Sequence, residues 1–282
     1  MFLIIFFIKN YILVCFLKLS KILLVSIILL AILSIGAVSA VDDNSSNLAA
    51  SNSADIISAD TPSQNIYVDT AGNDSNTGSS SSPFASLNRA ISQVNASNNA
   101  TIHVGAGVYS GENNTNLVIN LAHLNYNGTL TIIGDSNGGT IIDGDDESPI
   151  IYSIGADSIV KLINITFKNG KRDMGSAIRS SGDLTIDSCI FEANEATNLA
   201  AIYQEKANPL TIINSKFLKN KASQMADLYF SQNSIITLIN NVFDGAITSS
   251  SYAYAPGVSI QTGKSIIKGN TFKRVYFFVY SN

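Results

Sequence analysis

Carboxylates gather in one polar turn of the sequence in a way that suits a hard cation. Asp143, Asp145, Asp146 and Glu147 fall within eight residues, and Ca²⁺ prefers oxygen ligands of this kind. A second polar turn offers Asp74 beside an asparagine. Neither turn has the spacing of an EF-hand loop, so the sequence leaves two alternatives open, a Ca²⁺ site or an ordinary polar turn.

Acid–base chemistry has one candidate residue, Asp187. The repeat described below places Lys161 and Lys216 in the coils before and after it. A catalytic set would need a carboxylate and a base on one face of the fold. An exposed ion pair is the alternative that we favour. The chain has two histidines, His103 and His123, and we expect both in the wall or a loop of the fold.

The N-terminal segment has the features of an export signal. Residues 1–40 contain three lysines and no acidic residue, with an apolar run at 22–35 and small residues up to Ala40. This pattern predicts a secretory signal peptide cleaved after Ala40, and an uncleaved membrane anchor or a later start codon are the alternatives. Residues 41–65 are small and polar and predict a flexible polar spacer. After the leader the only cysteine is Cys189, so we expect no internal disulfide and a small wall residue there rather than a nucleophile.

An exported chain also carries possible glycosylation sites. The triplet Asn-X-Ser/Thr is an acceptor for N-linked glycans, and most of its copies fall in segments that predict spacer, loop or cap. The candidate acceptors are Asn44, Asn73, Asn95, Asn99, Asn113 and Asn127. A seventh triplet begins at Asn164, which we expect to belong to a column of asparagines in the repeats.

The charge distribution argues against a nucleic-acid partner. Residues 41–160 hold 13 acidic residues and one basic residue, whereas residues 161–282 hold 8 acidic and 13 basic residues. Binding to nucleic acid requires a clear basic excess on one surface. The chain as a whole has a formal net charge of −4. We therefore expect no nucleic-acid partner.

A repeat organises the second half of the chain. A phenylalanine returns after intervals of 24, 26, 26 and 29 residues, at Phe167, Phe191, Phe217, Phe243 and Phe272. Periods in this range mark solenoids, in which each repeat buries its apolar face by stacking on the next. Apolar residues stand seven and five residues before nearly every Phe, a spacing of two that predicts a strand. Three residues before each Phe comes Asn, Ser or Gly, which predicts a sharp bend.

The repeats predict an all-β fold, a single-stranded parallel β-helix solenoid that spans residues 100–282. A second strand is expected eleven residues after each Phe, where the chain is again apolar. The pattern contains no helix or hairpin signal, and it lacks the signatures of a leucine-rich repeat or a propeller blade. We expect the phenylalanines to form one inward column, and the insertion at 247–256 to leave the stack as a loop.

Before the coils, residues 66–99 predict an N-terminal cap. Ser82-Pro83 is a helix-start signal, and apolar residues then recur along one helical face from Phe84 to Val94. An exposed end of a solenoid needs a cover, and an amphipathic helix provides one. The fold class therefore includes an N-terminal capping helix.

The chain resembles a known group at this point. The stretch from Val68 to Ile91 has the form V-D-x-x-G-x-D-x-N-x-G followed by PF-x-S-L-x-x-A-I, and TIHVGAGVYSG and coils ending in N-x-x-F come after it. This order resembles the right-handed β-helix, pectate-lyase-like proteins, and most of all the adhesin-like surface proteins of methanogenic archaea. The resemblance covers about residues 66–282. It implies a right-handed coil and a secreted or cell-surface location.

The outward positions of the repeated strand do not favour an enzyme. Polysaccharide-cleaving members of that group use carboxylates, Ca²⁺ and a basic residue on one face, whereas a stripe of Thr and Ile is an ordinary β-surface. The outward positions are Lys161, Thr185, Thr211, Thr237 and Ile266, then Ile163, Asp187, Ile213, Ile239 and Lys268.

We therefore expect a non-catalytic, adhesin-like protein that presents a face and loops to a surface polysaccharide or a cell-surface protein. Tyr252 and Tyr254 of the insertion could contribute to sugar binding. The alternatives are a polysaccharide lyase or glycoside hydrolase of the β-helix type, and a truncated fragment of a longer adhesin.

The last coil predicts an interaction edge. Apolar residues fill 275–280, and no capping pattern follows them in the sequence. Because an uncovered strand edge is a template for pairing with another chain, we expect self-association through the C-terminal edge or a further segment that covers it.

Overall fold

The computed structural model describes residues 63–95, 99–122, 128–230, 234–248, 258–261, 264–274 and 277–280. The chain divides into two compact units, Met1–Ile57 and Ser58–Asn282, and all of the described residues belong to the second unit. The expected signal peptide and nearly all of the expected spacer therefore lie outside the described residues. The cap and the coils lie mostly within them.

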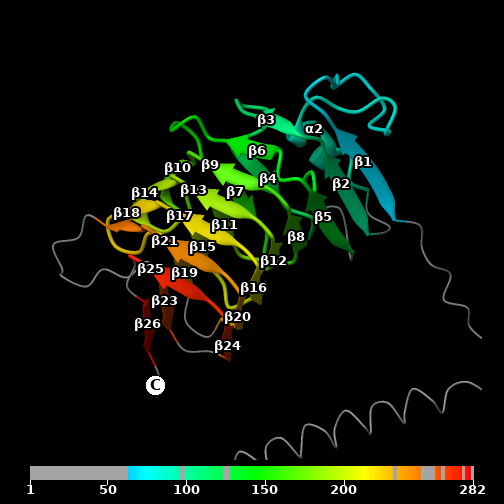
Figure 1. Ribbon diagram of the computed structural model, residues 1–282. Coiled ribbons are helices and arrows are strands. Elements are labelled where there is room, and N and C mark those ends of the chain that lie inside the picture. Colours follow the sequence, from blue (N-terminus) through cyan, green and yellow to red (C-terminus); the bar gives the residue numbers. More distant parts are fainter. Residues whose placement is uncertain are drawn as a thin grey trace, which may run out of the picture. The chain divides into compact units, whose positions relative to one another are not determined.

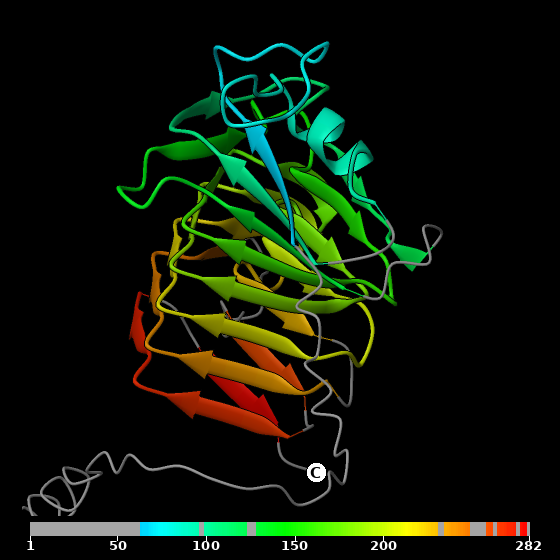
Figure 2. The same cartoon turned by 90° about the vertical axis from the view of Figure 1, so that its right-hand side faces the viewer.

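The second unit is a parallel β-solenoid, as Figures 1 and 2 show. Successive coils contribute neighbouring strands to the same sheets, and each of these pairings is parallel. The first sheet has eight strands in chain order: β1 (Gln64–Val68), β2 (Ala100–Val104), β5 (Thr129–Ile133), β8 (Ile159–Ile163), β12 (Asp183–Asp187), β16 (Leu210–Ile213), β20 (Ile236–Ile239) and β24 (Ser265–Lys268). The expectation of stacked, parallel, all-β coils is confirmed.

Two further long sheets complete the walls. The second sheet contains β3 (Gly107–Tyr109), β6 (Thr140–Asp143), β9 (Thr166–Lys168), β13 (Ile190–Glu192), β17 (Lys216–Leu218), β21 (Val242–Asp244) and β25 (Thr271–Lys273). The third sheet contains β4 (Leu117–Ile119), β7 (Ile151–Ile154), β11 (Ile178–Ser180), β15 (Ile202–Gln204), β19 (Leu228–Phe230), β23 (Val258–Gln261) and β26 (Phe277–Tyr280). The strands β11, β15 and β19 are the ones expected eleven residues after Phe167, Phe191 and Phe217.

A fourth, shorter sheet appears in the middle coils. It contains β10 (Lys171–Met174), β14 (Glu195–Leu199), β18 (Lys221–Ala222) and β22 (Ile247–Thr248). These coils therefore have four strands each, one or two more than the sequence pattern indicated. Their outward residues are mostly charged or polar, so hydrophobic alternation gives no signal for them.

The bend before each Phe divides the expected strand into two. Asn164, Ser188, Asn214 and Asn240 have φ between 53° and 56° and lie between the first and second sheets, and Gly269 has φ 67° in the same column. This left-handed conformation disfavours most L-residues, and Asn and Gly adopt it most readily. The bend is therefore a sharp corner between two sheets.

The core is a continuous column of apolar side chains inside these walls. Phe167, Phe191, Phe217 and Phe243 are fully buried, and the centroids of consecutive rings lie 4.8–5.0 Å apart in near-parallel stacks. Strand register places each Phe beside the next, through to Phe272. The expected inward column is confirmed.

One short helix, α2 (Leu87–Ser92), follows β1 and precedes β2 in the chain. Its side chains Leu87, Ala90 and Ile91 are buried against the core, and Ser86 is its N-cap, with Oγ accepting a hydrogen bond from the Arg89 N–H at 3.2 Å. The amphipathic helix expected in 66–99 therefore forms. Strand β1 begins at Gln64, two residues before that expected boundary.

A column of polar side chains supports the corner between the first and second sheets. Ser215, two residues before Phe217, accepts a hydrogen bond from the Cys189 N–H at 3.1 Å. In the following coils the Ser215 N–H donates to Asn241 Oδ1 at 2.9 Å, and the Asn241 N–H donates to Asn270 Oδ1 at 2.9 Å. Each coil therefore supplies an acceptor for the buried corner N–H of the coil before it.

A second buried column lies between the second and fourth sheets. The Gly170 N–H donates to Asn194 Oδ1 at 2.8 Å, and the Asn194 N–H donates to Asn220 Oδ1 at 3.0 Å. Asn220 Nδ2 then donates to Asp227 Oδ1 at 3.0 Å. The asparagine ladder therefore forms in these two columns, and Asn164 takes part in the sharp corner instead.

The final coil ends the first three sheets with β24, β25 and β26. Ile267 and Phe272 of this coil are partly buried and pack against the core, whereas the corresponding residues of the middle coils are fully buried. Val275 and Tyr276 of the expected apolar edge lie outside the described residues. Self-association through this edge stays a prediction.

The first testable prediction concerns the phenylalanine column. We expect Phe217→Ala to lower the free energy of unfolding by roughly 3–5 kcal/mol, because the lost ring leaves a cavity between two stacked neighbours. Phe272→Ala is the matched control and should cost clearly less, because Phe272 is only partly buried. Chemical denaturation measures both losses. Equal losses of unfolding free energy in the two variants would contradict the conclusion that the core is less tightly packed in the last coil.

The carboxyl of Asp227 makes the stability of the fold depend on pH. Burial raises the pKa of Asp227 from 3.8 to about 7, and the hydrogen bond from Asn220 opposes that change. A pKa that is higher in the folded state means that the folded chain binds the proton more tightly. This stabilising contribution is fully present below pH 3.8 and is lost as the pH rises through 7.

The second prediction follows from that sign. Between about pH 4 and pH 7, the unfolding free energy of the wild type should fall relative to that of Asp227→Asn by up to about 1.4 kcal/mol per pH unit. Urea denaturation at several pH values measures the difference. Glu112→Gln, which removes an exposed carboxylate, controls for the loss of one negative charge. Parallel curves for the wild type and Asp227→Asn would refute the prediction.

Candidate functional site

A column of tyrosine and arginine side chains projects from the third sheet. Arg179 of β11, Tyr203 of β15 and Tyr229 of β19 are aligned in register, and Tyr152 belongs to the neighbouring strand β7. The strand neighbours of Arg179, Tyr203 and Tyr229 on either side, such as Ile178 and Ser180, are buried, and Tyr152 is itself exposed, so these four side chains lie on the outer surface. We call Tyr152, Arg179, Tyr203 and Tyr229 the tyrosine–arginine strip.

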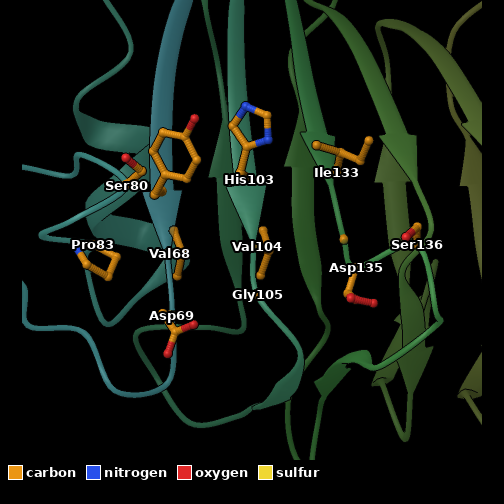
Figure 3. A pocket seen from close by; sticks show the side chains of 12 residues that line it. Val68, Asp69, Ser80, Pro83, His103, Val104, Gly105, Ile133, Asp135 and Ser136 are labelled. Carbon is orange, nitrogen blue, oxygen red and sulfur yellow. The ribbon is translucent and has the colours of Figure 1, made fainter.

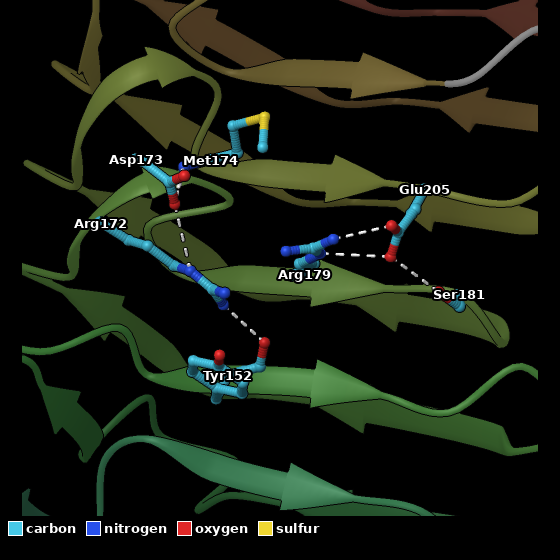
Figure 4. A network of polar contacts seen from close by, with 7 residues as sticks. All are labelled: Tyr152, Arg172, Asp173, Met174, Arg179, Ser181 and Glu205. Atoms are coloured by element: carbon cyan, nitrogen blue, oxygen red, sulfur yellow. Dashed lines mark hydrogen bonds and ion pairs between the residues drawn. The ribbon is translucent and has the colours of Figure 1, made fainter.

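An ion pair between neighbouring coils holds Arg179 of the strip (Figure 4). Arg179 Nη2 lies 2.7 Å from Glu205 Oε1, Arg179 Nε donates to Glu205 Oε2 at 3.2 Å, and Ser181 Oγ donates to the same Oε2 at 3.1 Å. These contacts lower the pKa of Glu205, chiefly through the hydrogen bond from Arg179, and the same hydrogen bond raises the pKa of Arg179. Both groups therefore stay charged near neutral pH.

A second arginine fixes Tyr152, at the N-terminal end of the strip. Arg172 of β10 reaches back to the preceding coil, where its guanidinium carbon lies 4.0 Å from the centroid of the Tyr152 ring. Its Nη1 donates to the Tyr152 carbonyl at 2.7 Å, and its Nε lies 3.4 Å from Asp173 Oδ1. Tyr152 as a whole residue is still 43% exposed. The ring is therefore held in place and remains accessible to a ligand.

Tyr203 and Tyr229 stack on each other at the C-terminal end of the strip. The ring centroids of Tyr203 and Tyr229 lie 5.4 Å apart with an interplanar angle of 8°, and the Arg179 guanidinium carbon lies 5.7 Å from the Tyr203 ring centroid. Because neighbouring rings cover each other's faces, a ligand would meet mainly ring edges and hydroxyl groups. Burial raises the pKa of Tyr203 above its ordinary value, and the negative charge of Glu205 raises it by a smaller amount. The Tyr203 hydroxyl therefore stays protonated and can donate a hydrogen bond.

The expected acid–base candidate at Asp187 has different partners from those that the sequence suggested. Its Oδ1 accepts hydrogen bonds from Ser188 Oγ at 2.9 Å and from Asn214 Nδ2 at 3.0 Å. Among the ion pairs of the described residues, none joins Asp187 to Lys161 or Lys216. Expecting an ion pair there was wrong, because Lys161 pairs in register with Thr185, and Lys216 belongs to the second sheet.

The calcium candidates make internal hydrogen bonds. Asp143 accepts from Asn169 Nδ2 at 3.0 and 3.2 Å and from the Asp145 N–H at 3.0 Å. Asp145 and Asp146 form the turn itself, with φ of 52° and 56°. Within the described part of the chain, no group of three or more His, Cys, Asp or Glu could hold a metal ion. Calcium binding at this turn stays a prediction.

Asp74, the other calcium candidate, supports the start of α2. Its Oδ1 accepts from the N–H groups of Ala85 and Ser86, both at 2.9 Å, and its Oδ2 accepts from Ser86 Oγ at 2.8 Å. A carboxylate in this place satisfies backbone donors ahead of a helix. The structure therefore gives Asp74 a structural contact that the sequence did not indicate.

The remaining candidates do not come together in one site among the described residues. Asn73, Asn95, Asn99 and Asn113 are exposed, whereas Asn44 and Asn127 lie outside the described residues. His123, Tyr252 and Tyr254 also lie outside them. His103 is on β2, and its Nε2 is 2.9 Å from Asn65 Oδ1. Cys189 is buried, which raises its pKa to about 12 and makes a thiolate nucleophile unfavourable.

The sequence analysis did not find the tyrosine–arginine strip. Its signal was present, because Arg179, Tyr203 and Tyr229 each stand twelve residues after a repeat Phe. Only the register shows that these three residues share one outer column, and Tyr152 lies on β7, the next strand of the same sheet. No helix in the described residues is long and apolar enough to cross a membrane.

The fold and this surface define a parallel β-solenoid protein with an ordered polar and aromatic outer face. Residues 70–277 match the family described as "Protein of unknown function (DUF1565)", and because the match covers more than half of the chain, the chain belongs to this family. No curated protein and no solved structure matches it. The matched residues run from just after β1 to the start of β26.

The third prediction tests how strongly the two coils are coupled at the strip. A double-mutant cycle of Arg179→Met and Glu205→Gln should give a coupling energy of about 1 kcal/mol or less, because both side chains are partly exposed. Denaturation of the wild type, both single variants and the double variant measures it. The pair Lys221–Glu195 is more exposed and should couple less strongly. A larger coupling there than at Arg179–Glu205 would contradict the prediction.

Proposed function

We propose that this DUF1565 protein is an exported, non-catalytic, adhesin-like β-helix that binds a surface polysaccharide through the tyrosine–arginine strip. The observation that carries the proposal is the register of Arg179, Tyr203 and Tyr229 on adjacent strands of the third sheet. Parallel strands repeat about every 4.8 Å, so the strip offers similar groups at regular intervals along the stack. A polymer with repeated hydroxyl groups suits such an array.

The chemistry of the strip supports a sugar ligand. Tyrosine hydroxyls donate and accept hydrogen bonds, and the Arg179–Glu205 pair presents a charged donor beside a charged acceptor. The ion pair and the stacked rings hold these groups in one geometry before a ligand arrives, which lowers the entropic cost of binding. A cell-surface protein is the other partner that this face could accept.

The absence of catalysis is part of the proposal, and the electrostatics support it. Arg179 and Glu205 hold each other in their charged forms, so neither is suited to exchange a proton near neutral pH. Asp187 is engaged by a hydroxyl and an amide. A polysaccharide lyase or hydrolase would need a group poised to titrate in its groove.

Two structural details belong to the same proposal. We infer a right-handed coil, because connections between parallel strands in one sheet have that hand in nearly all proteins. We also infer that α2 covers the N-terminal end of the stack, since its apolar face is buried and its start is anchored by Asp74. Export by a signal peptide or anchor at 1–40 remains the expectation from the sequence. A fragment of a longer adhesin would present the same strip.

The fourth prediction concerns binding. A glycan array probed with the chain should identify a polysaccharide ligand, and Tyr203→Ala should weaken its binding about tenfold or more, because it removes the central ring and hydroxyl. Thr211→Ala, on the outer face of the first sheet, is the control and should leave the affinity unchanged. Equal binding by both variants would place the ligand elsewhere. Binding to cell-surface proteins without any glycan signal would overturn the choice of partner.

The same preparation tests the absence of catalysis. Incubation with polygalacturonate, with and without Ca²⁺, should release neither unsaturated nor reducing ends. Release of such ends that Asp187→Asn or Glu205→Gln abolishes would overturn the non-catalytic proposal and identify a polysaccharide lyase or hydrolase.

A further inference from the structure

A hollow of about 400 Å³ opens on the first sheet near its N-terminal end, as Figure 3 shows, whereas the tyrosine–arginine strip lies on the third sheet. Strands β1, β2 and β5 form its floor, and the turns that follow them form one side. Its lining consists of Tyr67, Val68, Asp69, Ser80, Pro83, His103, Val104, Gly105, Ile133, Gly134, Asp135 and Ser136. A volume of this size lies in the range of small-ligand sites.

The carboxylates of Asp69 and Asp135 lie on opposite sides of the lower part of the hollow in Figure 3. Each has one oxygen fixed by its own turn, since Asp69 Oδ1 accepts from the Ala71 N–H at 2.9 Å and Asp135 Oδ1 accepts from the Asn137 N–H at 2.8 Å. Among the described residues, the second oxygen of each carboxylate has no hydrogen-bond partner. Two oriented acceptors are therefore available to a ligand.

A glycine between the two carboxylates makes this arrangement possible. A Cβ added at Gly105 would lie 2.6 Å from Asp69 Oδ2, closer than real Cβ contacts come. The Asp69 carboxylate therefore leans over the backbone of the neighbouring strand, where any larger residue would displace it. Gly105 is also fixed in place, because its N–H donates to the Val68 carbonyl at 2.9 Å and its carbonyl accepts from the Tyr109 hydroxyl at 3.0 Å.

The upper wall of the hollow is aromatic and uncharged. The rings of Tyr67 and His103 stack with centroids 4.6 Å apart and an interplanar angle of 13°. Burial lowers the pKa of His103, which keeps the imidazole neutral at pH 7, and its Nε2 is held by Asn65 Oδ1. No Lys or Arg is among the described residues that line the hollow. The carboxylates therefore have no counter-charge in the lining.

We propose that this hollow is a second binding site, selective for an uncharged, hydroxyl-rich sugar residue. The two carboxylates and the hydroxyls of Ser80 and Ser136 suit a ligand that is rich in hydrogen-bond donors, and Pro83 and the aromatic edges suit the C–H faces of a sugar ring. Like-charge repulsion from Asp69 and Asp135 disfavours uronates and sulfated sugars. The site stands independently of the tyrosine–arginine strip.

The experiment follows the imidazole signals of the full chain by NMR as sugars are added. Mannotriose and cellotriose are the neutral probes, and trigalacturonate is the charged one. The chain has two histidines, so the spectrum of His103→Gln assigns the His103 signal. We expect a neutral trisaccharide to shift the His103 signal in a saturable manner and trigalacturonate to leave it unchanged. A stronger response to trigalacturonate, or no response to either neutral probe at millimolar concentration, would overturn the proposal.

Two variants connect the response to the carboxylates. Asp135→Asn keeps the acceptor for the Asn137 N–H but loses the charge, and we expect about tenfold weaker binding of the neutral probe. Gly105→Ala should weaken binding through displacement of the Asp69 carboxylate, without any change in charge. Thermal unfolding confirms that each variant is folded. Unchanged affinity in both folded variants would show that the carboxylates do not contact the ligand and would refute the site.

Controls separate this site from the rest of the surface. Asp157→Asn removes an exposed carboxylate elsewhere and should leave the titration unchanged. Tyr203→Ala, which disrupts the tyrosine–arginine strip, should also leave the His103 response intact. If Tyr203→Ala abolished the response, the hollow would not be an independent site. A normal response in that variant would support the hollow whatever the outcome for the strip.

Discussion

The fold depends on one constraint, which is that the backbone must turn sharp corners inside a tightly packed wall. At each corner an N–H group faces the interior, where an unpaired donor is costly. Ser215, Asn241 and Asn270 accept these bonds in successive coils, and Asn194 and Asn220 do the same at the next corner. Because each acceptor comes from the following coil, the corners remain satisfied only while the coils stay in register.

The same register creates the surface that we propose as a binding face. Once the phenylalanines and the corner amides are aligned, the outward positions of β11, β15 and β19 are aligned as well. The strip of Tyr152, Arg179, Tyr203 and Tyr229 is therefore a consequence of the inner packing as much as of its own contacts. The ion pair of Arg179 with Glu205 and the stacking of Arg172 on Tyr152 then fix the side chains within that column. The result is a rigid and repetitive face, which suits recognition of an extended partner better than chemistry at a single point.

The two proposed sites differ in charge, and this difference follows the distribution of charge along the chain. The acidic first half forms the hollow with Asp69 and Asp135, whereas the more basic second half supplies the arginines of the strip. Because the hollow lies on the first sheet and the strip on the third, a polysaccharide that engages both sites must reach around the stack from one wall to another. Linked weak sites raise the overall affinity without any new contact, provided that the ligand spans both of them.

The sequence by itself determined the coil, because periodicity is a local property that needs no knowledge of the partner strands. The spacing of Phe167, Phe191 and Phe217 predicted the inward column, and the Asn or Ser before each Phe predicted the bend. The tertiary structure decided what neighbours in space do. It made Asp187 a hydrogen-bond acceptor instead of half of an ion pair, made Asp74 an anchor for α2, and moved the asparagine ladder to Asn194, Asn220 and Asn241. These outcomes depend on distances between residues of different coils or turns, and such distances exist only after the chain has folded.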